Sequence, residues 1–410
     1  MNEKNSSNFG KFLILWSGAL ISSIGSGLTS FGLGVYVFNT TGSAAGMSLV
    51  TLLGFVPTLL LSVPAGVLAD RYDRRILMMI GDGFSAMGIL FILICMMTKE
   101  ATLFEICLGV FVSAVFSALL EPSYKATITD ILSKEEYSKA NGLVSMAGSA
   151  RYLFSPVIAG FLLGMSDVKL LLIIDILTFF VTLVSVAVIR KKIVSVKVSK
   201  DESFVESIKG GFKALSMKKG VLILVVISSG VTLSMGMFQI LAEPLILSFS
   251  DAKTLGISET VCAVGMLFSG VVLGIKGLKK SYVKKLSLSL AFAGLFMVGF
   301  GIKENIILIC TFGFLFFAVL PVANNCLDYL TRTNIPDEVQ GRVWGLIGFI
   351  SQLGYVVSYS VSGISADMIG RASGLGVGRG AAYVVQTAGV MLFILALLIP
   401  KPKSIKQLET

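Results

Sequence analysis

The strongest constraint on this chain is a long stretch without charge. Residues 12–69 contain no Asp, Glu, Lys or Arg, and the next six residues, DRYDRR from Asp70 to Arg75, carry five charges. Of the 410 residues, 55% are hydrophobic and 14% are charged, whereas soluble domains carry about 25% charged residues. So few polar groups could not cover so much apolar surface in water. We therefore expect a polytopic membrane protein.

The apolar residues fall into twelve runs that are long enough to cross a bilayer. A membrane-spanning helix needs about 20 mainly apolar residues. The runs are continuous and do not alternate between apolar and polar over about 10 residues, which excludes β-barrel strands. We expect an all-α fold with these spans: 12–38, 43–69, 76–98, 102–124, 139–165, 168–190, 220–248, 254–276, 284–302, 304–331, 340–367 and 379–400.

The first span and the cysteine and histidine content indicate how the chain begins in the membrane and argue against a metal site. The first run follows Lys4 and Lys11 and shows no small-residue cleavage site, so we interpret it as an uncleaved helix. The five cysteines have no metal-ligand spacing, and there is no histidine. We expect no metal and no cofactor, and any proton chemistry would fall to carboxylates.

The basic residues indicate how the spans are oriented. With the N-terminus in the cytoplasm, 27 Lys and Arg fall in cytoplasmic segments, six fall in outer loops and Arg151 lies inside a span. This asymmetry follows the positive-inside rule. The net charge of +10 is therefore explained by topology and by contact with anionic lipid, not by nucleic acid. We expect a multi-pass protein of the cytoplasmic membrane with both termini in the cytoplasm.

The longest polar connection divides the chain into two halves of six spans. The Lys-rich segment 191–219 separates an N-terminal half, 1–190, from a C-terminal half, 220–400, and residues 401–410 form a cytoplasmic tail. Within the connection, residues 203–215 have a capping-box pattern and one apolar face, which predicts a short interfacial helix.

The two halves resemble each other, and so do units within the first half. The loops after spans 4 and 10 are similar, with Glu136 and Glu338 at matching places. Asp82 in span 3 and Asp175 in span 6 each lie about six positions into their helix. Nested repeats of this kind are typical of transporters with paired six-helix halves.

The segment GVLADRYDRR, residues 66–75, which we term the loop motif, lies between spans 2 and 3 and resembles a signature of the major facilitator superfamily. The matching residues are Gly66, Asp70, Arg71, Arg74 and Arg75, and the position usually held by Gly is Asp73. Residues 121–143 and 339–354 are similar to the branch with bacterial macrolide efflux proteins and the enterobactin exporter.

The resemblance implies a gating role for the loop motif. Asp70, at the end of span 2, would meet the N-terminus of span 11, where the helix dipole favours negative charge, and would latch the halves while the cytoplasmic side is closed. Asp130 is a candidate partner for Arg71 or Arg74. The alternative is a topology anchor with solvated ion pairs worth about 0–1 kcal/mol each.

Arg151 is the most informative single residue. An Arg near the bilayer midplane costs about 2.5–3.5 kcal/mol on insertion scales, so it needs an interior position and a carboxylate partner. Asp82 and Asp175 lie at plausible depths, as does Glu121 nearer the cytoplasm. Both a fixed structural ion pair and a charge that responds to substrate or proton binding stay open.

A short element follows Arg151 in the same span. Residues 155–160, SPVIAG, resemble the Gly-Pro-x-x-Gly-Gly element of superfamily antiporters. Small residues permit close helix contact, and Pro156 frees a backbone carbonyl. Pro156 and Gly160 therefore predict a helix-packing element that favours export.

Several polar residues are candidates for binding protons or substrate. The resemblance places spans 1, 4, 7 and 10 around a central cavity, and burial favours the protonated form of a carboxyl group. The candidates on these spans are Glu121, Glu243, Asp328, Asn324 and Asn325.

These observations favour a monomeric secondary exporter of hydrophobic or amphipathic small molecules, which exchanges substrate for protons by alternating access. We expect no ATP-driven transport by this chain alone, because there is no phosphate-binding Gly-x-x-x-x-Gly-Lys-Ser/Thr motif. We expect no enzyme, because there is no histidine and no evident nucleophile–base set. One alternative is an exporter or flippase of a single physiological solute, such as a siderophore or a lipid. Another is a membrane sensor that keeps the fold without transport.

Overall fold

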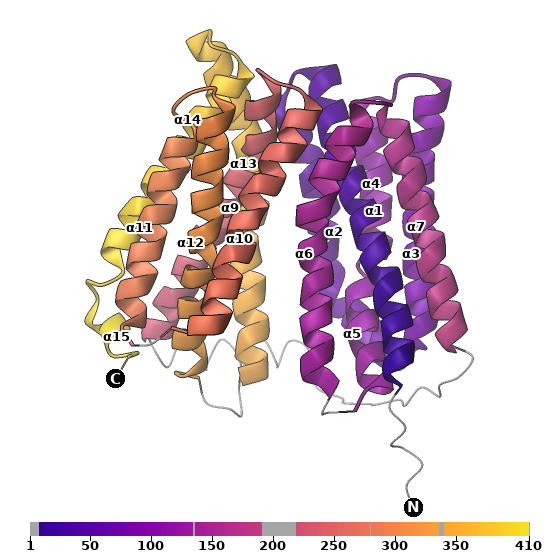
Figure 1. Cartoon of the computed structure of the whole chain (residues 1–410), viewed down its shortest axis with the longest axis horizontal. Coiled ribbons are helices and arrows are strands. Elements are labelled where there is room, and N and C mark those ends of the chain that lie inside the picture. The colour runs from indigo at the N-terminus through magenta and orange to yellow at the C-terminus, as the bar shows by residue number, and fades with distance from the viewer. Residues whose placement is uncertain (1–7, 134–135, 191–218, 279, 336–339, 410) are drawn as a thin grey trace, which may run out of the picture. The chain divides into compact units, whose positions relative to one another are not determined.

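The computed structural model describes residues 8–133, 136–190, 219–278, 280–335 and 340–409 (Figure 1). In this part of the chain the regular structure is helical, and twelve helical segments are long and apolar enough to cross a membrane. The predicted all-α, twelve-span architecture is confirmed. The interfacial helix predicted at 203–215 lies outside the described residues.

The chain divides into two compact units. Unit 1 comprises Met1–Thr40 and Leu49–Lys200, and unit 2 comprises Thr41–Ser48 and Asp201–Thr410. The helices from the N-terminus to the end of unit 1 are α1 (Phe9–Thr41), α2 (Ala44–Arg71), α3 (Arg74–Thr98), α4 (Leu103–Ser117), α5 (Leu120–Ile131), α6 (Tyr137–Leu163) and α7 (Val168–Arg190).

The long helices of unit 2 run alternately up and down, as those of unit 1 do (Figure 1). Its first segment is the N-terminal turn of α2. The others are α9 (Lys219–Leu247), α10 (Ala252–Lys276), α11 (Tyr282–Phe300), α12 (Ile306–Arg332), α13 (Gln340–Ser373), α14 (Val377–Leu398) and α15 (Lys403–Lys406).

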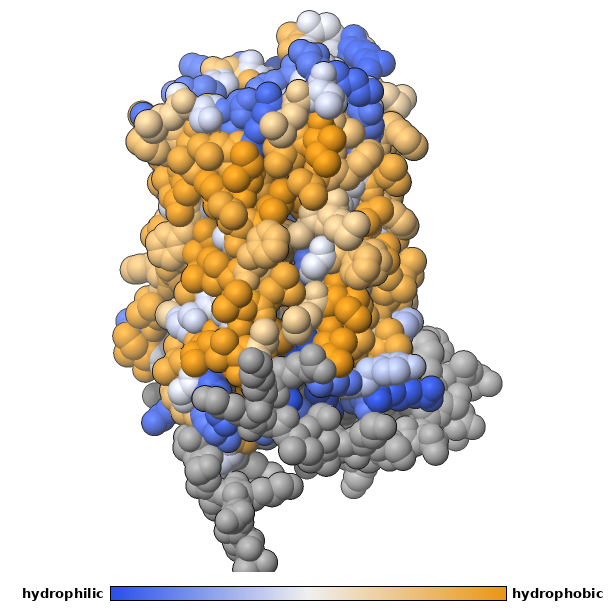
Figure 2. Space-filling model, turned by 90° about the vertical axis from the view of Figure 1, so that its right-hand side faces the viewer, coloured by the Kyte–Doolittle hydropathy of each residue, from blue (hydrophilic) through white to orange (hydrophobic). Residues whose placement is uncertain are grey.

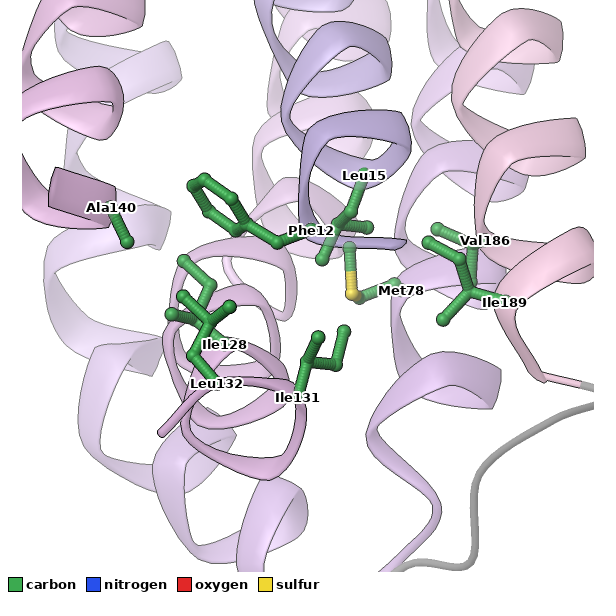
Figure 3. Close-up of a cluster of buried hydrophobic side chains, with 9 residues drawn as sticks. All are labelled: Phe12, Leu15, Met78, Ile128, Ile131, Leu132, Ala140, Val186 and Ile189. Carbon is green, nitrogen blue, oxygen red and sulfur yellow. The ribbon is translucent and has the colours of Figure 1, made fainter. Parts of the chain in front are cut away.

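An apolar cluster holds together one end of unit 1 (Figure 3). Phe12 and Leu15 of α1 pack with Met78 of α3 and with residues from α5, α6 and α7. The remaining members are Ile128, Ile131, Leu132, Ala140, Val186 and Ile189. The cluster lies where α1 begins and α7 ends, so it fixes the helix ends next to the loop motif.

Span 4 consists of two helices, and Pro122 explains the break. Helix α4 ends at Ser117 and α5 begins at Leu120. Pro122 has no N–H to donate to the carbonyl of Ala118, and its ring crowds that carbonyl. The span continues as α5 and ends at Ile131, beyond the predicted end at 124.

Apolar side chains remain exposed along the spans. Figure 2 shows one face with apolar residues between two polar ends. Met97, Phe104 and Ile275 are 71%, 75% and 79% exposed, respectively. Exposed apolar surface of this extent marks a surface that meets a partner or a membrane, and it accounts for the low charge content of the chain.

Asp367 of α13 caps the N-terminus of α2 inside unit 2. Its carboxylate accepts hydrogen bonds from Ser43 Oγ at 2.5 Å, Ala44 N at 2.9 Å and Ala45 N at 3.3 Å. Helix α2 starts here, and a carboxylate satisfies N–H groups that have no partner within the helix. Asp367 lies within α13, which continues to Ser373, beyond the predicted end of span 11 at 367.

The C-terminal tail docks against unit 2. Ile405 is fully buried and Leu408 is 8% exposed. Glu409 Oε1 accepts a hydrogen bond from Val283 N at 2.6 Å, at the start of α11. Asn334 Nδ2 donates to Leu408 O at 2.9 Å. The tail therefore links the ends of α11 and α12.

Ile405→Ala is expected to destabilise unit 2 by about 2–4 kcal/mol, because it leaves a cavity in a fully buried contact. The measurement is thermal unfolding of the purified chain in detergent. Lys403→Ala is the matched control, since Lys403 is exposed on the same short helix. Equal melting temperatures for the two variants would contradict a docked tail.

Candidate functional site

The loop motif is held by helix-end chemistry. Helix α2 ends at Arg71 and α3 begins at Arg74, with Asp73 as the N-cap of α3. The Asp73 side chain accepts a hydrogen bond from Arg75 N at 3.0 Å. Asp is a preferred N-cap residue. The Asp in place of the usual Gly is therefore compatible with a short turn that starts the next helix.

Arg74 ties the loop motif to α5. Its Nη1 atom donates to Asp130 Oδ1 at 2.6 Å and to Ala126 O at 3.0 Å, while Nε donates to Ala69 O at 3.1 Å. The side chains of Arg74 and Asp130 are each 11% exposed. The structure thus pairs Asp130 with Arg74, whereas Arg71 is exposed. Asp70 is 64% exposed and lies 3.9 Å from Arg74.

Asp130→Ala is expected to lower the free energy of unfolding by about 3–5 kcal/mol, because it leaves the largely buried Arg74 guanidinium without its partner carboxylate. Asp70→Ala is expected to cost less than about 1 kcal/mol, because Asp70 is exposed and its ion pair is long. Denaturant unfolding of both variants in detergent checks the difference. Similar losses would show that the two carboxylates support Arg74 equally.

A polar cluster lies inside unit 1. We use the name unit 1 acid cluster for Asp82 of α3, Asp175 of α7, Arg151 of α6 and Ser26 of α1. Each aspartate is 1% exposed. Ser26 Oγ donates to Asp175 Oδ1 at 3.3 Å. The charges of Asp82 and Asp175 act on each other, and the charge of Arg151 acts on Asp175.

Glycines on α1 create the space that this cluster occupies. A Cβ atom at Gly25 would lie 2.9 Å from Asp175 Oδ1, and one at Gly27 would lie 3.1 Å from Arg151 Cγ. Helix α1 therefore approaches α7 with one face and α6 with another. Small residues make such close approach possible within a bilayer.

The predicted packing element lies next to the unit 1 acid cluster. Ser155 Oγ donates to Ile24 O at 3.0 Å, across the contact between α6 and α1. Pro156 lies inside α6, and Gly160 is buried four residues later. The element therefore lies on the helix that carries Arg151 and abuts α1.

Unit 2 contains a second pair of carboxylates. We use the name unit 2 acid pair for Glu243 of α9 and Glu259 of α10, which are half-buried and whose charges act on each other. Within the described residues, neither forms an ion pair with a Lys or Arg. One turn before Glu243, Gln239 Oε1 accepts a hydrogen bond from Tyr359 OH at 3.1 Å.

The remaining candidates are exposed. Glu121 is paired with Lys125 at 2.5 Å on the surface of α5. Asn324, Asn325 and Asp328 lie on one exposed face of α12. These side chains are exposed, in contrast to the more enclosed Glu243 and Asp82.

The sequence matches the family described as Major Facilitator Superfamily over residues 15–359. The chain belongs to the major facilitator superfamily. It is therefore a multi-pass membrane transporter of small molecules and not an enzyme, as predicted.

The chain is also similar to individual transporters and to solved structures. It is 26% identical over 413 residues to Macrolide efflux protein A of Streptococcus pyogenes, with 97% of each chain covered. It is 27% identical over 326 residues to Macrolide efflux protein A of Enterococcus faecalis, covering 76% of this chain and 98% of that protein. Its fold matches an inward-facing bacterial homologue of the human lysosomal transporter Spinster, with a TM-score of 0.74, 14% identity and 98% of each chain covered.

The sequence did not predict two residues of these sites: Glu259 of the unit 2 acid pair and Ser26 of the unit 1 acid cluster. Glu259 lies on α10, which is not one of the spans that the resemblance places around a cavity. An acid within an apolar run is the signal that could have identified Glu259. Ser26 gave no distinct signal, because span 1 contains several similar hydroxyl residues. Both residues become evident only when helices that are distant in sequence are packed together.

Proposed function

We propose that this transporter exports hydrophobic or amphipathic small molecules of the macrolide type across the cytoplasmic membrane, in exchange for protons, by alternating access. The observation that carries the proposal is the end-to-end match to Macrolide efflux protein A, which covers 97% of both chains. The basic residues of the sequence support an orientation with both termini in the cytoplasm.

The unit 2 acid pair supports proton coupling. Two neighbouring carboxylates without a basic partner repel each other, so taking up one proton relieves the repulsion. Intramembrane acids mark proton pathways in many transporters. In this proposal Glu243 carries a coupling proton, Glu259 sets its affinity, and Asp328, Asn324 and Asn325 contact substrate. Glu121 stays a further candidate for either role.

The loop motif supports a gating role in the same cycle. Arg74 is occupied by Asp130 and by two carbonyl groups. The carboxylate of Asp70 is 64% exposed and is therefore accessible for a different contact during the cycle. In this proposal Asp70 acts in gating, and Arg74 with Asp130 keeps the loop rigid.

Inverted membrane vesicles test the proposal. With an interior-acid pH gradient, vesicles that contain this transporter should accumulate a radiolabelled macrolide, and a protonophore should release it. Vesicles without the transporter give the background. A macrolide gradient that persists after the pH gradient has collapsed would contradict proton coupling. Absence of accumulation for macrolides but not for siderophores or lipids would favour a single physiological solute.

A further inference from the structure

We propose that the unit 1 acid cluster is a proton-binding site, separate from the unit 2 acid pair, with Asp82 as the residue that holds the proton. The cluster joins four helices of one unit, and both of its carboxylates are 1% exposed. Its role in transport rests on the function proposed above, whereas its occupancy by a proton can be measured without any substrate.

The charges of the cluster do not cancel. With both aspartates ionised, Asp82, Asp175 and Arg151 carry a net charge of −1, and binding one proton makes the cluster neutral. A buried uncompensated charge is costly, and a buried acid avoids this cost by binding a proton. Proton uptake is therefore the simplest way for the cluster to reach neutrality inside the bilayer.

A fixed ion pair does not account for the arrangement. Within the described residues, no carboxylate lies within 4.0 Å of the Arg151 guanidinium. Arg151 therefore acts on Asp175 through space, and the cluster can change its charge without breaking a direct salt bridge.

The surroundings of the two aspartates differ. Burial disfavours the charged form of both aspartates. Asp175 differs in accepting a hydrogen bond from Ser26 Oγ at 3.3 Å, which favours its ionised form relative to Asp82. Asp82 Oδ2 is buried and has no hydrogen-bond partner among the described residues. A carboxylate oxygen without a donor is stabilised by binding a proton, so the proton belongs on Asp82.

Few other charges bear on this site. Helix α3 packs on α4, α5 and α7. Apart from Asp175 and the terminal Arg190, the charged residues of these helices are paired elsewhere: Glu105 with Lys99, Glu121 with Lys125, Asp130 with Arg74 and Lys169 with Asp167. Helix α1 carries no charged residue between Phe12 and Thr41. The protonation of the site is therefore governed by Asp82, Asp175 and Arg151.

Infrared difference spectroscopy of the purified full-length chain tests the proposal. Wild type should show a protonated-carboxyl C=O band that disappears with rising pH, and Asp82→Asn should remove the component that Asp82 contributes while the component from the unit 2 acid pair remains. Asp82→Glu should retain a component from this position. The matched control is Asp167→Asn, because Asp167 is an exposed aspartate of the same unit paired with Lys169, and it should leave the band unchanged. An unchanged band in folded Asp82→Asn would overturn the proposal.

A second variant covers the case in which Asp82→Asn does not fold. Asp175→Asn removes the negative charge that acts on Asp82, so the component from Asp82 should disappear at lower pH than in wild type. An unshifted midpoint would also overturn the proposal. The proposed function fails separately if wild type shows the titrating band but no substrate moves protons.

Discussion

Glu243→Gln is expected to abolish export driven by a pH gradient and to leave the protein folded. Glu243 is half-buried beside Glu259, with no basic partner among the described residues. Glutamine keeps the size and polarity of the protonated acid but cannot release a proton. With one coupled proton, a pH difference of one unit sustains about a tenfold substrate ratio, and this ratio should fall to the background value in the variant.

The control for this prediction is Glu304→Gln, because Glu304 is an exposed acid of the same unit. Exchange of labelled for unlabelled substrate at equal pH should persist in Glu243→Gln, because exchange needs no net proton movement. Undiminished accumulation by Glu243→Gln under a pH gradient would show that the unit 2 acid pair does not carry the coupling proton.

Gly265→Ala is expected to lower the stability of unit 2 strongly, whereas Gly270→Ala in the same helix should have little effect. A Cβ atom at Gly265 would overlap the Phe314 carbonyl oxygen and would lie 3.2 Å from Ala318 N, both on the backbone of α12. Backbone atoms cannot move aside as a flexible side chain can, so α10 and α12 must separate. Overpacking typically costs about 1–3 kcal/mol, and a backbone clash belongs at the upper end.

Gly270 provides a strict comparison, since a Cβ atom there would meet nothing within 4 Å. Both substitutions add one methyl group and raise the helix propensity of α10 equally. Thermal unfolding in detergent should therefore separate them by several degrees. Equal melting temperatures would show that α10 and α12 do not pack as closely as described.

The fold was accessible from sequence because hydropathy alone defines membrane spans. The uncharged run from 12 to 69 contains α1 and α2, and the charges of Asp70 to Arg75 mark the turn between α2 and α3, in agreement with the structure. Span 4 was predicted too short because the hydropathy count stops near Pro122, whereas the helix resumes and continues to Ile131.

The candidate sites were only partly accessible, because they depend on contacts between distant helices. The depth of the charged residues within their spans predicted a carboxylate partner for Arg151 among Asp82, Asp175 and Glu121. In the structure Arg151 and Asp175 both lie against α1, and no direct ion pair of Arg151 is found within the described residues. The sequence could not identify Glu259 as the neighbour of Glu243. Nor could it identify Asp367 of α13 as the cap of a different helix, α2.

The most direct test of the account is proton movement driven by substrate in proteoliposomes that contain only this transporter. A macrolide gradient imposed without a pH gradient should drive protons in the opposite direction, so the compartment that gains macrolide should become more alkaline. The change should vanish in Glu243→Gln. Macrolide movement by wild type with no accompanying pH change would contradict proton-coupled export.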